Sequence, residues 1–267
     1  MEDIEFWKGR MTELSIRAKT RRLVTSTKFL SVSEQNEALK PLHISFSETY
    51  SYLYHDVAFF AEGGYDEAER RCFFFLPPQE KEDEVRERIR HGEGISCLHF
   101  YPKNKRYAES LTHRDVLGSL MNLGFERENF GDILFDGDDI YVMAILNAAK
   151  EILENVTSIR HTAVSGEILA PKDCKAKPHF EDVQIVIASP RIDCILAEVY
   201  SLSREDAQTL IREGHVFVNG GDCLSPSKEI MGNTRVSVQG KGKFYFLDIE
   251  KTTRKGRLIA NIRRFVS

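Results

Sequence analysis

The sequence predicts an α+β protein in three parts: a helical N-terminal region (residues 1–65), a central α-β plait (66–180) and a small C-terminal domain (181–267). Three observations support this prediction. Apolar residues recur among many charges in the first part, predicted strands and helices alternate in the second, and a helix–turn–helix–strand pattern begins near residue 189. With 267 residues, the chain is long enough for two or three domains with a sizeable core.

The N-terminal region is expected to be mostly helical. Residues 31–42 predict a helix with Ser33 as its cap and Pro41 after its end. An aromatic cluster follows: Tyr50, Tyr52, Tyr54, Phe59 and Phe60. We expect these rings to pack in a core, although aromatic residues among basic ones can also stack on nucleotides. The basic run at residues 17–28 is expected to be a solvated face, with a secondary RNA contact as the alternative.

The central part predicts a β-α-β-β-α-β order. Its strands are expected at 95–101, 132–135, 140–145 and 164–169, and its helices at 112–123 and 147–156. This order is that of the ferredoxin-like fold shared with RNA-recognition motifs. A strand at 72–76 and a charged helix at 80–90 precede it, and residues 171–179 form a polar linker. The strand predicted at 183–188 suits either neighbour. Base stacking on the plait is not expected, because its strands lack the aromatic pattern of those motifs.

The most informative stretch is residues 189–219. Its first helix has one apolar face, Ser203 can cap the second helix, and Gly214 suits the left-handed stop after it. Arg204, Gln208 and Arg212 lie at i, i+4 and i+8, on one face of the second helix. Arginine forks match phosphate oxygens, so this face suits an RNA backbone. A helical hairpin whose polar face is merely solvated is the alternative.

The order of residues in this stretch closely resembles the RNA-binding domain of ribosomal protein S four, the alpha-L motif. The matching positions are Ser189, Arg191, Ile192, Asp193, Ser203, Arg204, Ile211, Gly214, Val216, Val218 and Asn219. From residue 189 onward there are 13 Lys and Arg against 9 Asp and Glu, although the whole chain has a net charge of −4. A local basic surface on an acidic body is typical of nucleic-acid binding.

Two basic turns follow the helices. One contains Lys241 and Lys243, and the other contains Arg254, Lys255 and Arg257. Gly240 and Gly242 in the first turn allow another backbone to approach closely. We expect these turns and the helix face to form one continuous cationic surface. Lysines scattered for solubility are the alternative.

No enzyme chemistry is expected. The triplet His113-Arg114-Asp115 resembles a kinase catalytic loop, but Leu120 stands where that loop has Asn, so we interpret it as a helix start capped by Thr112. Pseudouridine synthases, which also carry the alpha-L domain, have a catalytic Asp where this chain has Ile259. No catalytic residue, metal site or cofactor is predicted. Five scattered cysteines, no long apolar run and no secretory signal indicate a cytoplasmic protein without a membrane segment.

Three further stretches resemble the YlmH family of Gram-positive bacteria. They are Gly63-Gly64-Tyr65 with Ala68-Glu69-Arg70-Arg71, the long segment 113–134 (HRDVLGSLMNLGFERENFGDIL), and the C-terminal GKGKF and TRKGR turns. The resemblance covers nearly the whole chain. It implies a cytoplasmic RNA-binding protein that associates with the large ribosomal subunit carrying an obstructed peptidyl-tRNA, in ribosome-associated quality control of stalled chains. A cell-division label is also attached to this family.

From these observations we hypothesise an RNA-binding protein, a monomer when free, whose partners are large-subunit rRNA and tRNA or peptidyl-tRNA. The predicted RNA-binding residues are Arg191, Asp193, Arg204, Gln208, Arg212, Asn219, Lys241, Lys243, Arg254, Lys255 and Arg257. Asp193 has a second interpretation, in which it orients an arginine and does not touch RNA. Two alternatives for the function stay open: a septum-associated protein with secondary RNA binding, and an RNA-modifying enzyme with an unfamiliar site.

Overall fold

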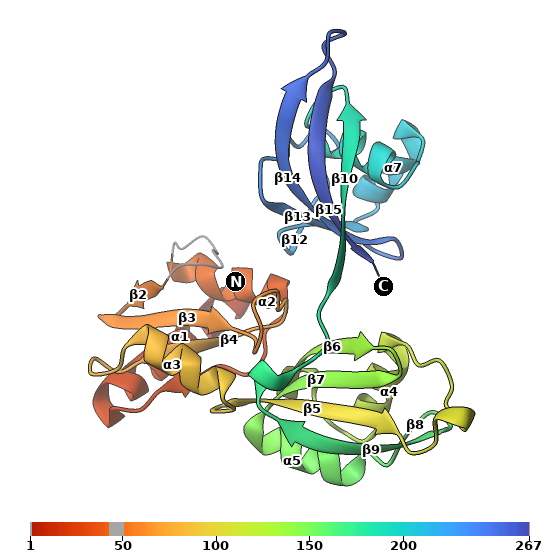
Figure 1. The fold of residues 1–267 in the computed structure, drawn as a ribbon. Helices are drawn as coiled ribbons and strands as arrows, with labels where there is room; N and C mark the ends of the chain where they lie inside the picture. Colours follow the sequence, from red (N-terminus) through yellow and green to blue (C-terminus); the bar gives the residue numbers. More distant parts are fainter. Residues whose placement is uncertain (1, 43–50, 267) are drawn as a thin grey trace. The chain divides into compact units, whose positions relative to one another are not determined.

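The computed structural model describes residues 2–42 and 51–266 and divides the chain into two compact units, Met1–Lys177 and Pro178–Ser267 (Figure 1). Each unit has its own sheets and its own buried cores. Tyr50, the first member of the predicted aromatic cluster, lies outside the described residues. Within the described ranges, no helix is both long and apolar enough to cross a membrane.

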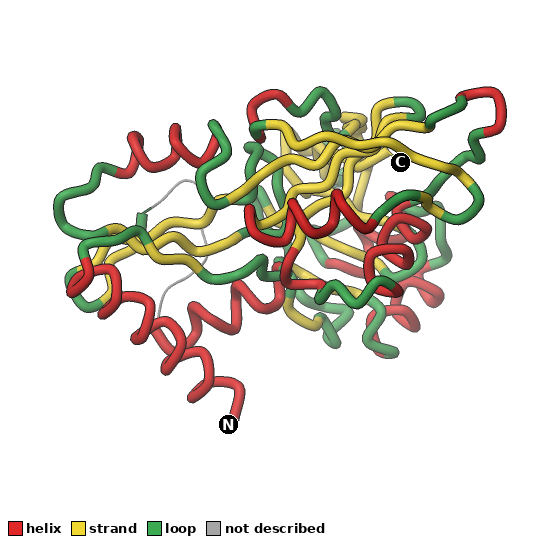
Figure 2. Tube along the Cα trace, turned by 90° about the horizontal axis from the view of Figure 1, so that it is seen from below, coloured by secondary structure: helices red, strands yellow, loops and turns green. Residues whose placement is uncertain are grey.

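A four-stranded antiparallel sheet forms the N-terminal part of the first unit, in the order β1-β4-β3-β2. Its strands are β1 (Thr25–Ser26), β2 (Tyr52–Tyr54), β3 (Val57–Glu62) and β4 (Cys72–Leu76). The long helix α1 (Glu2–Arg21) packs along this sheet, and Figure 2 shows it beside the yellow strands. Two shorter helices, α2 (Val32–Leu39) and the 3-10 helix η1 (Lys40–Leu42), pack against α1.

The prediction of a mostly helical region over residues 1–65 is wrong for residues 52–62, which form two strands. The strand at 72–76 also pairs with β3 and β1, so it completes this sheet and does not join the plait. The reason lies in the aromatic residues. Phe59, Phe73 and Phe75 pack toward α1, whereas Phe60 and Phe74 pack on the opposite face of the sheet. Because both of their faces are buried, β3 and β4 show no apolar–polar alternation in the sequence.

The cap of α2 also differs from the prediction. Ser31, not Ser33, precedes the helix: its hydroxyl accepts a hydrogen bond from the Glu34 backbone N–H at 3.3 Å. In return the Glu34 carboxylate accepts from the Ser31 N–H at 2.6 Å, which completes a capping box. The same reciprocal arrangement starts α4 (His113–Asn122), where Thr112 is the cap and Asp115 its partner, as predicted.

The plait follows, joined to the N-terminal sheet by α3 (Glu82–Arg90). Its strands are β5 (Ile95–Pro102), β6 (Phe130–Asp136), β7 (Asp139–Ile145), β8 (Ser158–Ile159) and β9 (Thr162–Leu169), and its helices are α4 and α5 (Leu146–Asn155). Short 3-10 turns are η2 (Lys105–Tyr107), η3 (Arg127–Asn129) and η4 (Pro171–Asp173). The sheet is antiparallel in the order β6-β7-β5-β9-β8. Its four main strands have the ferredoxin-like order, which confirms the predicted fold class.

The two faces of the plait sheet have different environments. Leu98, Phe100 and Val142 pack under α4 and α5. On the other face, Cys97 and Met143 are buried in a second core shared with the N-terminal sheet and α3. RNA-recognition motifs use this second face for base stacking. Here the N-terminal sheet and α3 cover much of it.

The second unit contains one six-stranded antiparallel sheet in the order β10-β15-β14-β13-β11-β12. Its elements are β10 (His179–Ile187), α6 (Ile192–Val199), α7 (Arg204–Arg212), β11 (Val216–Val218), β12 (Gly221–Asp222), β13 (Thr234–Val238), β14 (Gly242–Thr252) and β15 (Leu258–Val266). β10 pairs with β15 along its whole length. The strand predicted at 183–188 therefore belongs to the C-terminal unit.

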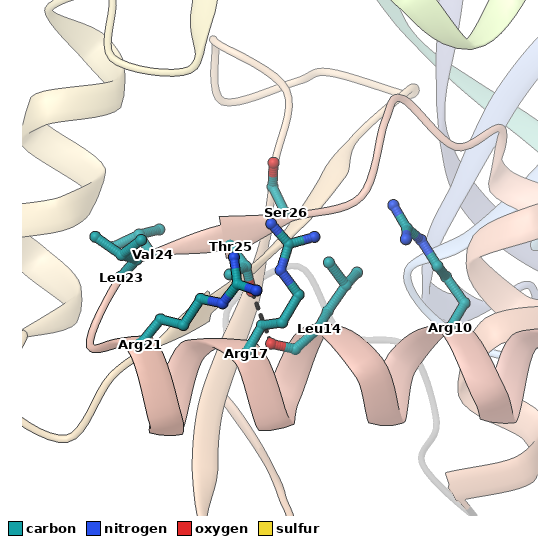
Figure 3. Close-up of a pocket in the computed structure, with 8 residues that line it drawn as sticks. All are labelled: Arg10, Leu14, Arg17, Arg21, Leu23, Val24, Thr25 and Ser26. Atoms are coloured by element: carbon teal, nitrogen blue, oxygen red, sulfur yellow. Dashed lines mark hydrogen bonds between the residues drawn. The ribbon is translucent and has the colours of Figure 1, made fainter.

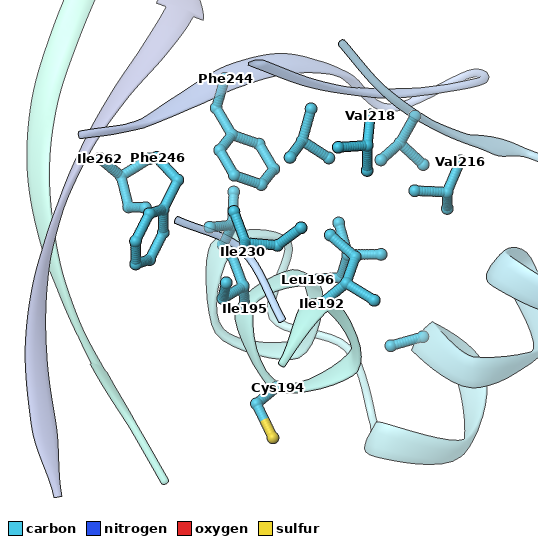
Figure 4. Close-up of a cluster of buried hydrophobic side chains, with 14 of the residues drawn as sticks. Ile192, Cys194, Ile195, Leu196, Val216, Val218, Ile230, Phe244, Phe246 and Ile262 are labelled. Carbon is cyan, nitrogen blue, oxygen red and sulfur yellow. The ribbon is translucent and has the colours of Figure 1, made fainter. Parts of the chain in front are cut away.

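Alternation in the strands places one apolar face of this sheet under the two helices. Phe244 and Phe246 of β14 point toward Ile192 and Ile195 of α6 in a fully buried core (Figure 4). Gly214 adopts a φ of 78° directly after α7, so it provides the predicted left-handed stop. The sheet and its core hold α6 and α7 as a fixed pair, and that pair carries the candidate site.

Candidate nucleic-acid interface

The carboxylate of Asp193 lies at the centre of a hydrogen-bond network in the first turn of α6. Arg191 donates to both of its oxygens, from Nε at 3.1 Å and from Nη2 at 2.9 Å. From α7, Arg204 Nε donates at 3.2 Å and Gln208 Nε2 at 2.8 Å. The backbone N–H of Cys194 adds a fifth bond at 3.0 Å. A carboxylate at a helix N-terminus is also favoured by the helix dipole.

Asp193 is fully buried, with 0% of its surface exposed. Burial alone raises the pKa of a carboxyl group, but the hydrogen bonds from Arg191, Gln208 and Arg204 outweigh it and lower the pKa of Asp193 to about 2. The group is therefore ionised and has no face open to a ligand. The prediction that Asp193 touches RNA is therefore wrong. The structure agrees with the second interpretation, in which Asp193 orients the arginines.

The partners of Asp193 remain open to solvent. The Arg191 and Arg204 side chains are 34% and 55% exposed. Arg212 donates from Nη2 to Gln208 Oε1 at 3.2 Å, which extends the chain of contacts by one helical turn. We call Arg191, Asp193, Arg204, Gln208 and Arg212 the Asp193 network. Each arginine has five N–H donors and uses only part of them here, so donors remain for phosphate oxygens.

The two basic turns lie at opposite ends of β14 and do not form one surface. The turn with Lys241 precedes β14, and the turn with Arg254 and Lys255 follows it. Because β14 has 11 residues, its two ends lie roughly 30 Å apart at about 3.4 Å per residue. The expectation of a single continuous cationic surface is therefore wrong. The turn with Lys241 is the one beside the end of α7, since Gln239 N–H donates to the His215 carbonyl at 2.9 Å.

Lys243 points away from the helices. Its neighbour Phe244 lies in the core under α6 and α7, so alternation directs Lys243 to the opposite sheet face. There its Nζ lies 4.4 Å from the ring centroid of Phe265, which also contacts the rings of Phe180 and Tyr245. Lys243 and the Asp193 network are thus on different faces of the same sheet.

Two other predicted residues are held by contacts within the protein. Arg257 donates to the Val186 carbonyl at 2.7 Å and to the Glu198 carboxylate at 3.2 Å. Asn219 has a φ of 49°, and its side-chain oxygen accepts from the Arg235 N–H at 2.9 Å. These contacts give Asn219 a role in a turn between strands and give Arg257 a role in bracing β15 against α6.

One basic and aromatic segment was not identified from the sequence. Lys105, Arg106 and Tyr107 form η2, next to the end of β5, with Asn104 capping the turn. The Tyr107 ring is 72% exposed, and the Arg106 guanidinium carbon lies 5.8 Å from its centroid. An exposed ring beside cations suits an unpaired base. The signal was the KNKRY run directly after a predicted strand.

Within residues 2–42 and 51–266, no three His, Cys, Asp or Glu side chains are grouped so that they could hold a metal ion.

Comparison with known proteins places these features in a family. A model described as the putative RNA-binding domain in YlmH matches residues 100–172, and the S4 domain model matches residues 190–236. The ribosome-associated protein quality control protein P2 of Bacillus subtilis (strain 168) is 30% identical over 212 residues, which are 76% of each chain. The structure of the cell division protein ylmH from Streptococcus pneumoniae aligns with a TM-score of 0.44 and 22% identity, over 63% of this chain and 91% of that one.

The plait, the C-terminal helix pair and its outward arginines define an RNA-binding protein with an S4 domain at its C-terminus. The S4 match covers the whole Asp193 network. The chain belongs to the YlmH family.

Proposed function

We propose that this protein binds the large ribosomal subunit and peptidyl-tRNA through its C-terminal domain, in ribosome-associated quality control of stalled nascent chains. The family membership and the name of the Bacillus subtilis relative support this proposal. Under this proposal, the protein acts in the cytoplasm and is a monomer when free. It carries out no covalent chemistry.

The Asp193 network is the observation that carries the proposal. The guanidinium groups of Arg191 and Arg204 are fixed by a buried carboxylate before any ligand arrives, and both side chains stay partly exposed. Fixed forks of this kind bind phosphates at a low cost in side-chain entropy. Arg191, Arg204 and Arg212 therefore grip one segment of structured RNA backbone, and Lys241 contacts the same RNA beyond the end of α7. Arg254 and Lys255, at the far end of β14, contact a separate segment.

Co-sedimentation with purified large subunits in sucrose gradients tests this proposal. The variant Arg191→Ala/Arg204→Ala removes two phosphate-binding forks, and we expect it to bind large subunits at least about tenfold more weakly. Binding of the unaltered protein should fall steeply as salt rises, because phosphate contacts release counterions. Nuclease treatment should move the unaltered protein to the top of the gradient.

The same domain offers a matched control. Arg263→Ala/Arg264→Ala also removes two positive charges, but these arginines are paired with Asp182 at 2.8 Å and Glu181 at 2.6 Å. Binding of this control should stay within about twofold of the unaltered protein. An equal loss of binding in both variants would mean that the effect comes from the net charge of the domain and not from the Asp193 network. Unchanged sedimentation of a folded Arg191→Ala/Arg204→Ala variant would refute the assignment and favour a protein whose RNA binding is secondary.

A further inference from the structure

A second group of arginines lines a pocket in the N-terminal unit, between α1 and β1 (Figure 3). The pocket has a volume of about 240 Å³. Arg10, Arg17 and Arg21 line one side, and Leu23 and Ser26 belong to the segment that closes the other. We call it the α1 arginine pocket. None of its residues belongs to the C-terminal domain.

The helical repeat explains why these three arginines meet. They are seven and four residues apart, so at 3.6 residues per turn they lie on one narrow stripe of α1. Figure 3 shows all three side chains on the same side of the helix, with the guanidinium groups of Arg17 and Arg21 next to each other. Like charges at i and i+4 destabilise a helix. A bound anion would relieve this repulsion.

The protein supplies only part of that negative charge. Glu13 contacts Arg10 at 2.9 Å and Arg17 at 3.5 Å, and it is itself 49% exposed. Within the described residues, the Arg21 side chain has no hydrogen-bond or ion-pair partner. Cations are favoured near a helix C-terminus, which accounts for Arg21 but not for Arg10 in the middle of α1. Three guanidinium groups and one carboxylate leave the pocket with an uncompensated positive charge.

We propose that the α1 arginine pocket is a binding site for the phosphate group of a nucleotide. Arg17 and Arg21 hold the phosphate oxygens, and Arg10 supports them from two turns away. Leu23, which is 58% exposed at the rim, gives the sugar or base an apolar contact. The phosphate belongs either to an RNA backbone or to a free nucleotide. The proposal does not rest on the Asp193 network.

Isothermal titration of the full-length protein tests this site with three probes: inorganic pyrophosphate, adenosine monophosphate, and an RNA tetranucleotide without a terminal phosphate. The test variant is Arg17→Gln/Arg21→Gln. Lys8→Gln/Lys19→Gln is its control, because it removes the same charge from the opposite face of the same helix. All titrations are made in an Arg191→Ala/Arg204→Ala background, so that loss of the C-terminal interface cannot be mistaken for loss of this one.

We expect Arg17→Gln/Arg21→Gln to weaken binding of at least one probe tenfold or more, and the control to stay within about twofold. An effect on the tetranucleotide identifies an RNA backbone as the source, whereas an effect on pyrophosphate and adenosine monophosphate alone identifies a free nucleotide. Arg10→Gln, a single exposed change, should give a smaller loss of the same kind and covers the case of a misfolded double variant. Absence of binding by every probe, or equal binding by the test variant and the control, would overturn the proposal.

Discussion

Two arginine clusters in this protein differ in what lies between the cations. In the Asp193 network a carboxylate with 0% exposure accepts bonds from Arg191 and Arg204. In the α1 arginine pocket, Glu13 is the one acid in contact among the residues that the structure describes, and it is half exposed. A buried acid fixes its arginines before a ligand binds, whereas an exposed acid leaves them mobile and electrostatically unsatisfied. The first arrangement is suited to recognition of a defined RNA shape, and the second to holding a phosphate wherever one arrives.

The largest expected effect comes from removing the charge of Asp193. Asp193→Asn keeps the shape of the side chain but leaves Arg191 and Arg204 without their anionic acceptor. Because those arginines are partly exposed, we expect a moderate loss of about 2 kcal/mol in the free energy of unfolding. RNA affinity should fall at least about tenfold. Urea denaturation and filter binding of RNA measure the two effects, and an unchanged RNA affinity would contradict the positioning role.

Acid pH should remove the same contribution in the unaltered protein. The pKa of Asp193 is lowered from 3.8 to about 2, so the ionised carboxylate stabilises the folded state at pH values above 3.8. That stability is lost as the pH falls toward about 2. The difference in urea midpoint between the unaltered protein and Asp193→Asn should be constant from pH 7 to pH 5 and shrink below pH 4. A difference that does not change with pH would show that the charge of Asp193 is unimportant.

A smaller effect is expected in the salt dependence of RNA binding. Each phosphate contact contributes about 0.7 to 0.9 to the slope of log affinity against log salt concentration. Arg204→Ala should therefore reduce the slope by about one. Arg257→Ala should change it less, because Arg257 already contacts Glu198. Equal slopes for all three proteins would place the phosphate contacts elsewhere.

The smallest effect should come from Glu13 in the α1 arginine pocket. Glu13→Gln removes an exposed acid, so the urea midpoint should not change measurably. Pyrophosphate should bind more tightly, about twofold to fivefold, because Arg10 and Arg17 lose a competing partner. Weaker pyrophosphate binding would mean that Glu13 positions the arginines, and the contrast with Asp193 would disappear.

Local patterns predicted much of the C-terminal domain. The Ser203 cap, the stop at Gly214 and the row of Arg204, Gln208 and Arg212 follow from helical spacing, and the structure shows each of them. The convergence on Asp193 was foreseen only as a second interpretation. It depends on the packing of α7 against α6, which no single helix pattern determines.

Other features needed information that sequence patterns contain only weakly. The strand β3 was missed because buried aromatic residues on both faces of a sheet remove the alternation that marks a strand. The strand β2 has three residues, which is too short for a pattern to show. The sheet face on which Lys243 lies could have been predicted, because Phe244 and Phe246 are core residues and alternation then directs Lys243 to the other face. The stripe of Arg10, Arg17 and Arg21 on α1 was not predicted, because Arg10 lies outside the basic run at residues 17–28.

Ultraviolet cross-linking of the protein to RNA in cells, with sequencing of the RNA and mapping of the modified peptides, tests the central claim most directly. We expect cross-linked peptides from residues 189–212 to carry fragments of large-subunit rRNA or tRNA. Substitution of Arg191 and Arg204 by alanine should abolish those adducts and leave the protein folded. Adducts confined to the plait or to the strand with Arg263 and Arg264, with none on α6 or α7, would contradict the claim that the Asp193 network holds RNA.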